Sequence, residues 1–275
     1  MAIALSAASD GHKICQGRKP VALDFKNGIP SISIQIGGED VTAKIDTGSP
    51  VSLASDRLIE FENDDENVIG LESYYGDFQA QEGTIKGISI GNCSVTEVSM
   101  FSIITGAEEI VDLVDEGVIL GRDFLDAFDI ILDGPRSVAF IRNAKSPKDR
   151  TDFAYAVEYQ IGEDANICLF DTGFSADETM FIHQDAPILD SQNLFQPLDI
   201  VKHGASKSGL AQRVSIFGRL GNNPVRSFIA AIEQASDPID KSTGLGYCIV
   251  GSEVLKTHRV ILRSDQRLVG IKSNN

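Results

Sequence analysis

Short apolar runs recur along the whole chain, some alternating with polar residues and some continuous over a few positions. Glycine, asparagine and aspartate separate them, as at Gly91-Asn92 and Gly221-Asn222. Short apolar runs bounded by turn residues are typical of antiparallel β-strands. The clearest examples are residues 31–36, 85–90, 98–104, 214–217 and 228–232. The pattern therefore predicts an all-β protein.

Helical patterns are sparse in this sequence. Residues 122–128 are predicted to form one short helix that places Phe124, Leu125 and Phe128 toward the core. Residues 55–61 are a weaker candidate. We therefore expect few, short helices between the strands.

The sequence also repeats itself. The segment that ends in Asp46-Thr47-Gly48 aligns without a gap with the one that ends in Asp171-Thr172-Gly173, at an offset of 125 residues. Further on, Ile119-Leu120-Gly121 matches Ile249-Val250-Gly251 at an offset of 130, and the strands after them keep that offset. Two copies of so long a segment predict a duplicated domain.

The boundary between the copies falls in residues 142–152, which are polar and charged and contain one proline, as is usual for a linker. We expect an N-terminal segment at 1–19, an N-terminal lobe at 20–145 and a C-terminal lobe at 146–275. Each lobe should hold one Asp-Thr-Gly triplet.

Charge narrows the range of partners. The formal net charge is −16, from 24 Lys and Arg against 40 Asp and Glu. Such a surface repels nucleic acid and anionic membranes, so neither is expected as a partner. No apolar run approaches a membrane span, and the first 17 residues lack the pattern of a secretory signal. A cytoplasmic location is therefore expected, and the alternative is that a signal was removed before this numbering begins.

The four cysteines, at positions 15, 93, 168 and 248, include no Cys-x-x-Cys spacing and lie beside no histidine pair. A zinc site is therefore not expected. Cys168 and Cys248 fall in apolar runs that read as strands, where a buried free thiol is the usual outcome.

The two Asp-Thr-Gly triplets carry the candidate chemistry. A single triplet arises by chance in about one chain in twenty of this length. Here, each copy follows an apolar strand and precedes an apolar-apolar-glycine run of its own repeat. The alternative is that Asp and Gly only turn the chain after a strand, but the matching positions favour a shared site.

On these residues the chain resembles the aspartic proteases, in particular the retropepsin-like branch. The resemblance rests on residues 43–49 and 118–125, recurs at 169–173 and 248–255, and covers about residues 20–272. It implies two β-barrel-like lobes, related by a pseudo-two-fold axis and fused in one chain. A monomer would then contain a complete site, and no metal or organic cofactor would be needed.

The chemistry follows from bringing two carboxylates together. Asp46 and Asp171 cannot both ionise cheaply at close range, so they would share a proton and activate a water between them. Gly48 and Gly173 lack a Cβ, which allows the loops to approach closely. By the resemblance, the hydroxyls of Thr47 and Thr172 would cross-link the two loops to backbone groups.

One position departs from the family pattern. Ser49 follows the first triplet, and by the resemblance its hydroxyl would hydrogen-bond the adjacent carboxylate, but Phe174 stands at the equivalent place. A hydroxyl donor favours the ionised carboxylate, so we expect Asp46 to carry the charge and Asp171 to hold the proton. Ser175 could supply the missing hydroxyl if the loop shifts register.

The resemblance also implies hairpin flaps that close over a substrate. The candidate flap residues are Tyr74, Tyr75 and Gly76 in the first half and His203 and Gly204 in the second. Ordinary exposed hairpins are the alternative.

Taken together, the sequence predicts an aspartic endopeptidase that acts on a peptide or protein substrate. The alternative is a catalytically weak or inactive relative that binds extended peptides between the lobes. Signatures of serine hydrolases, phosphate-binding loops, dinucleotide-binding folds and zinc peptidases are absent from the sequence.

Overall fold

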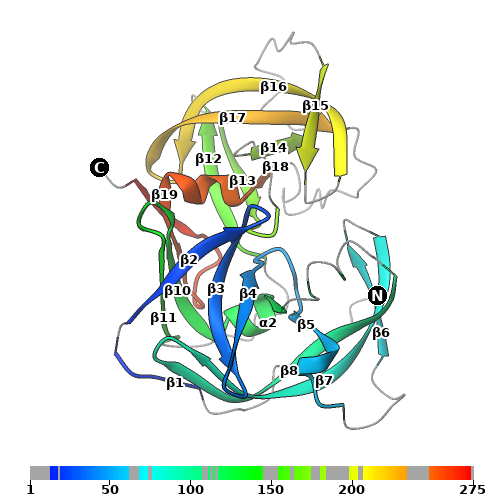
Figure 1. Cartoon of the computed structure of the whole chain (residues 1–275). Helices are drawn as coiled ribbons and strands as arrows, with labels where there is room; N and C mark the ends of the chain where they lie inside the picture. The colour runs from blue at the N-terminus through cyan, green and yellow to red at the C-terminus, as the bar shows by residue number, and fades with distance from the viewer. Residues whose placement is uncertain are drawn as a thin grey trace.

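The apolar runs form strands throughout the computed structural model (Figure 1). The structure describes residues 13–17, 19–61, 68–73, 76–106, 111, 114, 117–144, 154–161, 164–174, 180–183, 198–203, 207–233 and 248–273. We call the part before residue 145 the N-terminal half and the part after residue 153 the C-terminal half.

The strands of the N-terminal half are β1 (Lys13–Cys15), β2 (Pro20–Lys26), β3 (Ile29–Ile36), β4 (Glu39–Ile45), β5 (Leu53–Ala54), β6 (Val68–Ser73), β7 (Gly76–Ile90), β8 (Cys93–Gly106), β9 (Gly117–Leu120), β10 (Phe128–Asp133) and β11 (Val138–Asn143). The strands of the C-terminal half are β12 (Ala156–Ile161), β13 (Asp164–Phe170), β14 (Met180–His183), β15 (Leu198–His203), β16 (Lys207–Leu220), β17 (Asn223–Glu233), β18 (Cys248–Val250), β19 (His258–Leu262) and β20 (Gly270–Ser273). The helical elements are α2 (Arg122–Leu125) and the 3-10 turns Asp56–Leu58, Gly134–Arg136 and Ser252–Lys256.

The all-β prediction is confirmed, and the five predicted runs lie within β3, β7, β8, β16 and β17. The predicted helix at 122–128 is shorter than expected. It stops at Leu125 because Phe128 already belongs to β10, where it pairs with Asn143. Phe124, Leu125 and Phe128 are buried as predicted. The weaker candidate at 55–61 contains only one 3-10 turn.

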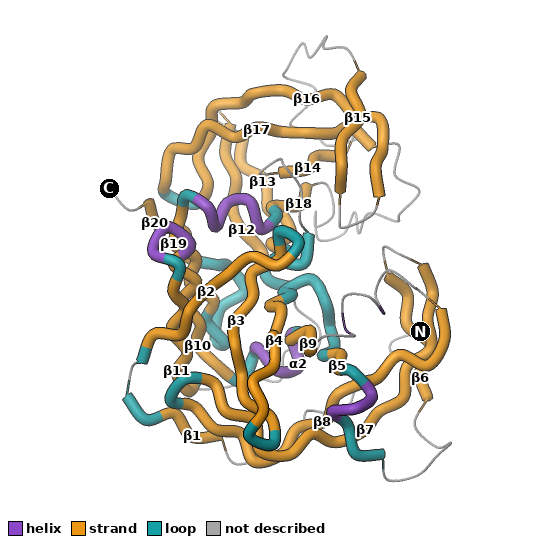
Figure 2. The backbone as a smooth tube through the Cα atoms, in the orientation of Figure 1, coloured by secondary structure: helices purple, strands orange, loops and turns teal. Residues whose placement is uncertain are grey.

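Both halves use the same strand arrangement around their triplets. β4, which leads into Asp46, pairs in parallel with β9, and β13, which leads into Asp171, pairs in parallel with β18. In Figure 2 most strands of the C-terminal half lie above those of the N-terminal half. The equivalent elements of the repeat therefore have equivalent positions in the fold.

One sheet joins the two halves. β10 of the N-terminal half pairs with β19 of the C-terminal half, and β20 continues the sheet beyond β19. The register places Ile131 opposite Ile261, Ile130 opposite Leu262, and Leu132 opposite Val260. Because positions 131 and 261 are equivalent in the repeat, a near-two-fold axis passes between them.

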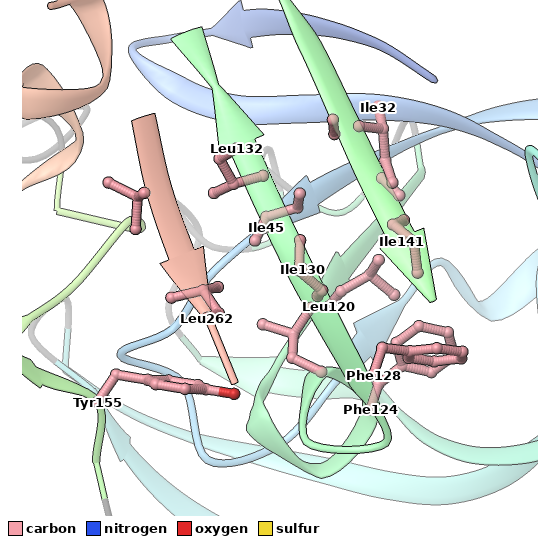
Figure 3. Close-up of a cluster of buried hydrophobic side chains, with 14 of the residues drawn as sticks. Ile32, Ile45, Leu120, Phe124, Phe128, Ile130, Leu132, Ile141, Tyr155 and Leu262 are labelled. Carbon is pink, nitrogen blue, oxygen red and sulfur yellow. The ribbon is translucent and has the colours of Figure 1, made fainter. Parts of the chain in front are cut away.

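The largest apolar cluster of the described residues spans both halves. Figure 3 shows Leu262 and Tyr155 of the C-terminal half in the same cluster as Ile130, Leu132 and Phe128 of β10. The hydroxyl of Tyr155 also donates to Asp126 across the boundary, at 2.6 Å. The halves therefore share a core beneath the common sheet.

The expectation of free thiols is wrong. All four cysteines form disulfides, Cys15 with Cys93 and Cys168 with Cys248. The reason is strand pairing. Cys15 lies opposite Cys93 in the β1–β8 register, and Cys168 and Cys248 each stand one residue before the paired positions Leu169 and Ile249. The described end of the N-terminal segment is therefore a strand fastened to the N-terminal half.

In the described part of the chain, no helix is long and apolar enough to cross a membrane. The predicted linker at 142–152 begins too early, because Arg142 and Asn143 still belong to β11. Residues 145–152 and the predicted lobe boundary lie outside the described residues, so that boundary remains a prediction.

Candidate active site

Each Asp-Thr-Gly triplet begins where a buried strand ends. The backbone N–H of Asp46 donates to the carbonyl of Leu120 at 3.0 Å, and that of Asp171 donates to Val250 at 3.0 Å. The parallel ladders thus continue as far as the two aspartates, and the chain turns immediately afterwards. Rigid strands therefore fix the start of both loops.

The two threonines bind the loops to each other. The hydroxyl of Thr47 donates to the carbonyl of Phe170 at 2.8 Å, and the hydroxyl of Thr172 donates to Ile45 at 2.6 Å. Each threonine N–H in turn donates to the hydroxyl of the other threonine, at 3.0 Å. Both residues have no exposed surface. These are the cross-links that the resemblance implies, and they connect residues 125 positions apart.

The glycines bring the carboxyl groups face to face. A Cβ built on Gly48 would lie 2.4 Å from the carboxyl group of Asp171, and one built on Gly173 would lie 2.4 Å from that of Asp46. Each carboxyl group therefore rests against the glycine of the other loop.

Backbone N–H groups hold one oxygen of each carboxyl. Oδ1 of Asp46 accepts from Gly48 and Ser49 at 2.9 and 3.0 Å. Oδ1 of Asp171 accepts from Gly173 and Phe174 at 2.8 and 3.2 Å. Since each carboxyl is fixed in the plane of its loop, its other oxygen is left for the partner carboxyl or a ligand.

Burial raises the pKa of both carboxyls, and for Asp171 the charge of Asp46 adds to that effect. Loss of water raises the pKa of Asp46, against the lowering effect of its hydrogen bonds to Ser49, Asp171 and Gly48 and of the charge on Arg122. The pKa of Asp171 is raised well above its usual value, first by burial and then by the charge of Asp46. Both carboxyls therefore hold a proton more readily than a free aspartate, and the charge on Arg122 favours ionisation of Asp46.

The expected role of the Ser49 hydroxyl is wrong, and the division of roles between the two aspartates remains a prediction. The hydroxyl of Ser49 donates to the carbonyl of Val51 at 2.6 Å and not to Asp46. A hydroxyl has one hydrogen to donate, and the loop carbonyl takes it. Only the backbone N–H of Ser49 reaches Asp46. Ser175, the alternative donor for Asp171, lies outside the described residues.

Two residues that support the first triplet loop, Asp123 and Arg122, were not recognised in the sequence. Asp123, the second residue of α2, accepts from both the N–H and the hydroxyl of Ser52, at 2.9 and 2.5 Å. The hydroxyl of Ser52 accepts in turn from the N–H of Gly121 at 2.9 Å. This network ties α2 to the chain that follows the first triplet. The apolar-apolar-glycine motif could have signalled it, because Asp123 follows Gly121 by two positions.

Arg122 is the other residue that was missed. Its backbone N–H donates to the carbonyl of Ser49 at 2.9 Å, which fixes α2 behind the first triplet. Its buried Nε has no hydrogen-bond partner, and its charge lowers the pKa of Asp46. At the equivalent place in the other half, the N–H of Ser252 donates to Phe174 at 3.1 Å. The cation is thus present on the Asp46 side and replaced by a neutral residue on the Asp171 side.

We predict that Arg122→Ser, which copies the equivalent residue of the other half, shifts the acid limb of the pH–rate profile to higher pH. Without the cation the Asp46 carboxylate ionises less readily, and the acid limb reports that ionisation. Arg122→Lys is the matched control and should keep the limb near its original position. Profiles of kcat/KM against pH for a cleaved peptide test this, and an unchanged limb in Arg122→Ser contradicts it.

The described residues on either side of the two predicted flaps form antiparallel strand pairs. In the first half β6 and β7 pair from Val68 opposite Gln81 to Ser73 opposite Gly76. In the second half β15 and β16 pair up to His203 opposite Lys207. Tyr74, Tyr75 and Gly204 lie outside the described residues. The backbone thus forms hairpins at both predicted places, on the right-hand side of Figure 1, and their contact with a substrate remains a prediction.

Among the described residues, no group of three or more His, Cys, Asp or Glu side chains is arranged to hold a metal ion.

The arrangement of strands and triplets defines the fold of the aspartic proteases, in its pepsin-like two-lobe form. Among solved structures, the chain is similar to the aspartic proteinase from Irpex lacteus, with a TM-score of 0.57 and 12% sequence identity. That alignment covers 94% of this chain and 97% of the fungal enzyme. No protein-family model and no curated protein sequence matches the chain. The similarity establishes the fold across nearly the full length.

Proposed function

We propose that this protein is an aspartic endopeptidase that hydrolyses peptide bonds with a water activated between Asp46 and Asp171. One observation carries the proposal. The two triplet loops are cross-linked by Thr47 and Thr172, and the buried carboxyl group of each loop lies against the glycine of the other. Pairs of this kind can supply a general base and a general acid at the same time.

In the proposed reaction, Asp46 starts ionised and Asp171 starts protonated. The Asp46 carboxylate takes a proton from water as the water oxygen bonds to the carbonyl carbon, and Asp171 gives its proton to the carbonyl oxygen. Asp46 then passes its proton to the amide nitrogen as the carbon–nitrogen bond breaks, and one hydroxyl of the intermediate returns a proton to Asp171. The products are a carboxylic acid and an amine, and both aspartates regain their starting states.

The test is incubation of the protein with a peptide library from about pH 3 to pH 8, the range in which a shared carboxyl proton matters. A parallel sample contains a peptide in which a secondary alcohol replaces the scissile amide, as a mimic of the tetrahedral intermediate. Cleavage that this mimic blocks supports the proposal. Tight binding of peptides without cleavage at any pH supports the alternative, a peptide-binding relative without activity.

Three finer features belong to the same proposal. The chain is related to the retropepsin-like branch, which is supported by the Gly121-Arg122-Asp123 sequence at the start of α2. A monomer holds the complete site, which is supported by the presence of both triplets in one chain. The hairpins β6–β7 and β15–β16 act as flaps over an extended peptide.

We also propose that the protein folds in an oxidising compartment, in place of the cytoplasmic location expected from the sequence. Two disulfides that use all four cysteines support this, because such bonds persist mainly outside reducing compartments. The two cysteines of the first disulfide are 78 residues apart in the sequence, and those of the second are 80 residues apart. Closing loops of that length stabilises a fold by about 4 kcal/mol each in the chain-entropy model.

We therefore predict that intact protein from its native source contains no free thiol by mass spectrometry after alkylation. Reduction should then lower the free energy of unfolding by several kcal/mol, on the order of that estimate. The variant Cys168→Ala/Cys248→Val reproduces Ala43 and Val118, the paired residues at the same place in the other half, and serves as a well-packed reduced control. Four alkylated cysteines in the native protein contradict the proposal.

A further inference from the structure

The charges on the sheet that joins the halves break its two-fold symmetry. The axis between Ile131 and Ile261 relates position 133 to 263 and position 129 to 259. At these places the N-terminal half has Asp133 and Asp129, and the C-terminal half has Arg263 and Arg259. Equivalent positions of the two halves therefore carry opposite charges.

At one end of the joining sheet, Arg259 and Asp133 are in close contact. Nε and Nη2 of Arg259 both donate to Oδ2 of Asp133, at 2.9 and 2.5 Å. The Asp133 side chain has no exposed surface, while that of Arg259 is 29% exposed. Arg136 of the same half adds a longer ion pair to that oxygen, at 3.9 Å, but its side chain is mostly exposed. The buried acid of one half is thus paired with a base of the other.

At the other end, Asp129 is also anchored across the boundary. Its Oδ1 accepts from the N–H of Ser264 at 3.3 Å, and its Oδ2 accepts from Arg142 of its own half at 2.9 Å. Only 8% of the Asp129 side chain is exposed. The pairing register ends at Ile130 opposite Leu262, and Arg263 is the first residue after β19.

The apolar residues of this sheet cannot distinguish one half from the other. Ile130 and Leu132 of β10 and Val260 and Leu262 of β19 are similar in size and all buried. Two N-terminal halves from different molecules could thus pair through β10 about the same axis. That pairing would place Asp133 of one copy opposite Asp129 of the other, two buried carboxylates without the Arg259 guanidinium. Two C-terminal halves would instead place Arg259 opposite Arg263.

We propose that these charges make the joining sheet selective, so that the N-terminal half accepts the C-terminal half and rejects a second copy of itself. A buried carboxylate that loses its cation is strongly destabilising, and like charges across an interface exclude the wrong partner. The occupant of the β10 edge is therefore the basic β19 strand. This selection concerns assembly and does not depend on the proposed peptidase activity.

Charge reversals in the full chain reproduce the two rejected arrangements. Arg259→Asp puts a carboxylate opposite Asp133, as in a pair of N-terminal halves, and Asp133→Arg puts a guanidinium opposite Arg259, as in a pair of C-terminal halves. The neutral replacements Arg259→Gln and Asp133→Asn measure the effect of losing the ion pair without placing like charges opposite each other. The double reversal restores opposite charges with the signs exchanged.

Equilibrium unfolding in urea is the measurement. We expect each reversal to lower the folding equilibrium constant at least about tenfold below its neutral counterpart, and the double reversal to regain most of that loss. The control is reversal of Lys86 and Glu60, a 2.5 Å pair within the N-terminal half whose side chains are both exposed. Exposed pairs contribute little, so its reversal should change the constant about twofold or less.

Two results would overturn the proposal. One is that both single reversals are at least as stable as their neutral counterparts. The other is that the double reversal is no more stable than the less stable of the two single reversals. If neither single reversal yields folded protein, the double reversal alone decides, because it folds if the charges select the partner and stays unfolded if they do not. Far-UV circular dichroism establishes folding in each case.

Discussion

Asp46→Asn and Asp171→Asn should each reduce peptide cleavage by at least about a thousandfold, because each removes one of the two proton-transfer groups of the pair. An amide is nearly the same size as a carboxyl, so the threonine cross-links between the loops should persist. Turnover of the best peptide from the library, measured at its optimum pH, tests this. Substantial activity in either variant would mean that another group performs the chemistry.

The same Asp171→Asn variant should be more stable than the parent protein at neutral pH. Burial and the charge of Asp46 raise the Asp171 pKa above 3.8, its value in an unfolded chain. The folded state therefore binds this proton more readily, and stability falls as the pH rises from about 3.8 through the raised pKa. Removing the carboxyl removes that loss, so the melting temperatures of the two proteins should converge in acid and separate at pH 7. An equal difference at both pH values contradicts this.

Gly48→Ala and Gly173→Ala should be nearly as damaging as loss of an aspartate. The added methyl group would lie 2.4 Å from the carboxyl group of the opposite loop, so the loops must separate. Since the threonine cross-links oppose that movement, both activity and stability should fall, with activity reduced at least about a hundredfold.

Gly270→Ala in β20 is the matched control for these substitutions. Its Cβ would meet Ile261 at 3.4 Å, an ordinary contact. Its thermal unfolding and peptide turnover should remain close to those of the parent. Gly48→Ala with full activity would show that the carboxyl groups do not need to be this close.

Much of the fold could be predicted because each sequence feature of one repeat is supported by its counterpart in the other. A strand that ends in Asp46-Thr47-Gly48 is ambiguous by itself, but its counterpart at Asp171-Thr172-Gly173 makes a shared site the simplest interpretation. The hairpin turns at Gly91-Asn92 and Gly221-Asn222 were also visible, because both lie between alternating apolar runs that become long paired strands.

The disulfide beside Asp171 was missed although a signal existed. Cys168 precedes Asp171 by three residues, and Cys248 precedes Gly251 by three. The corresponding residues of the other half, Ala43 and Val118, are paired across the parallel strands β4 and β9. Applying that register to the second half would have placed the two sulfur atoms side by side. The error came from treating each cysteine by its local sequence alone.

Other features depend on tertiary geometry that no local pattern contains. The hydroxyl of Ser49 had two possible acceptors, Asp46 and the carbonyl of Val51, and only the loop conformation selects the second. The pairing of Asp133 with Arg259 joins residues 126 positions apart, so it follows from the register of β10 with β19 and from nothing near either residue.

The position of β10 has a consequence for synthesis on the ribosome. β10 ends at Asp133, whereas β19 begins only at His258, so a growing chain completes β10 long before its neighbour exists. During that interval the free edge of β10 offers unpaired backbone groups to other nascent chains, which is a route to aggregation. Inward-pointing charges on an edge strand hinder such pairing. Asp129 and Asp133 stand near the two ends of this edge, so we expect them to hinder pairing between unfinished chains until Arg259 is translated.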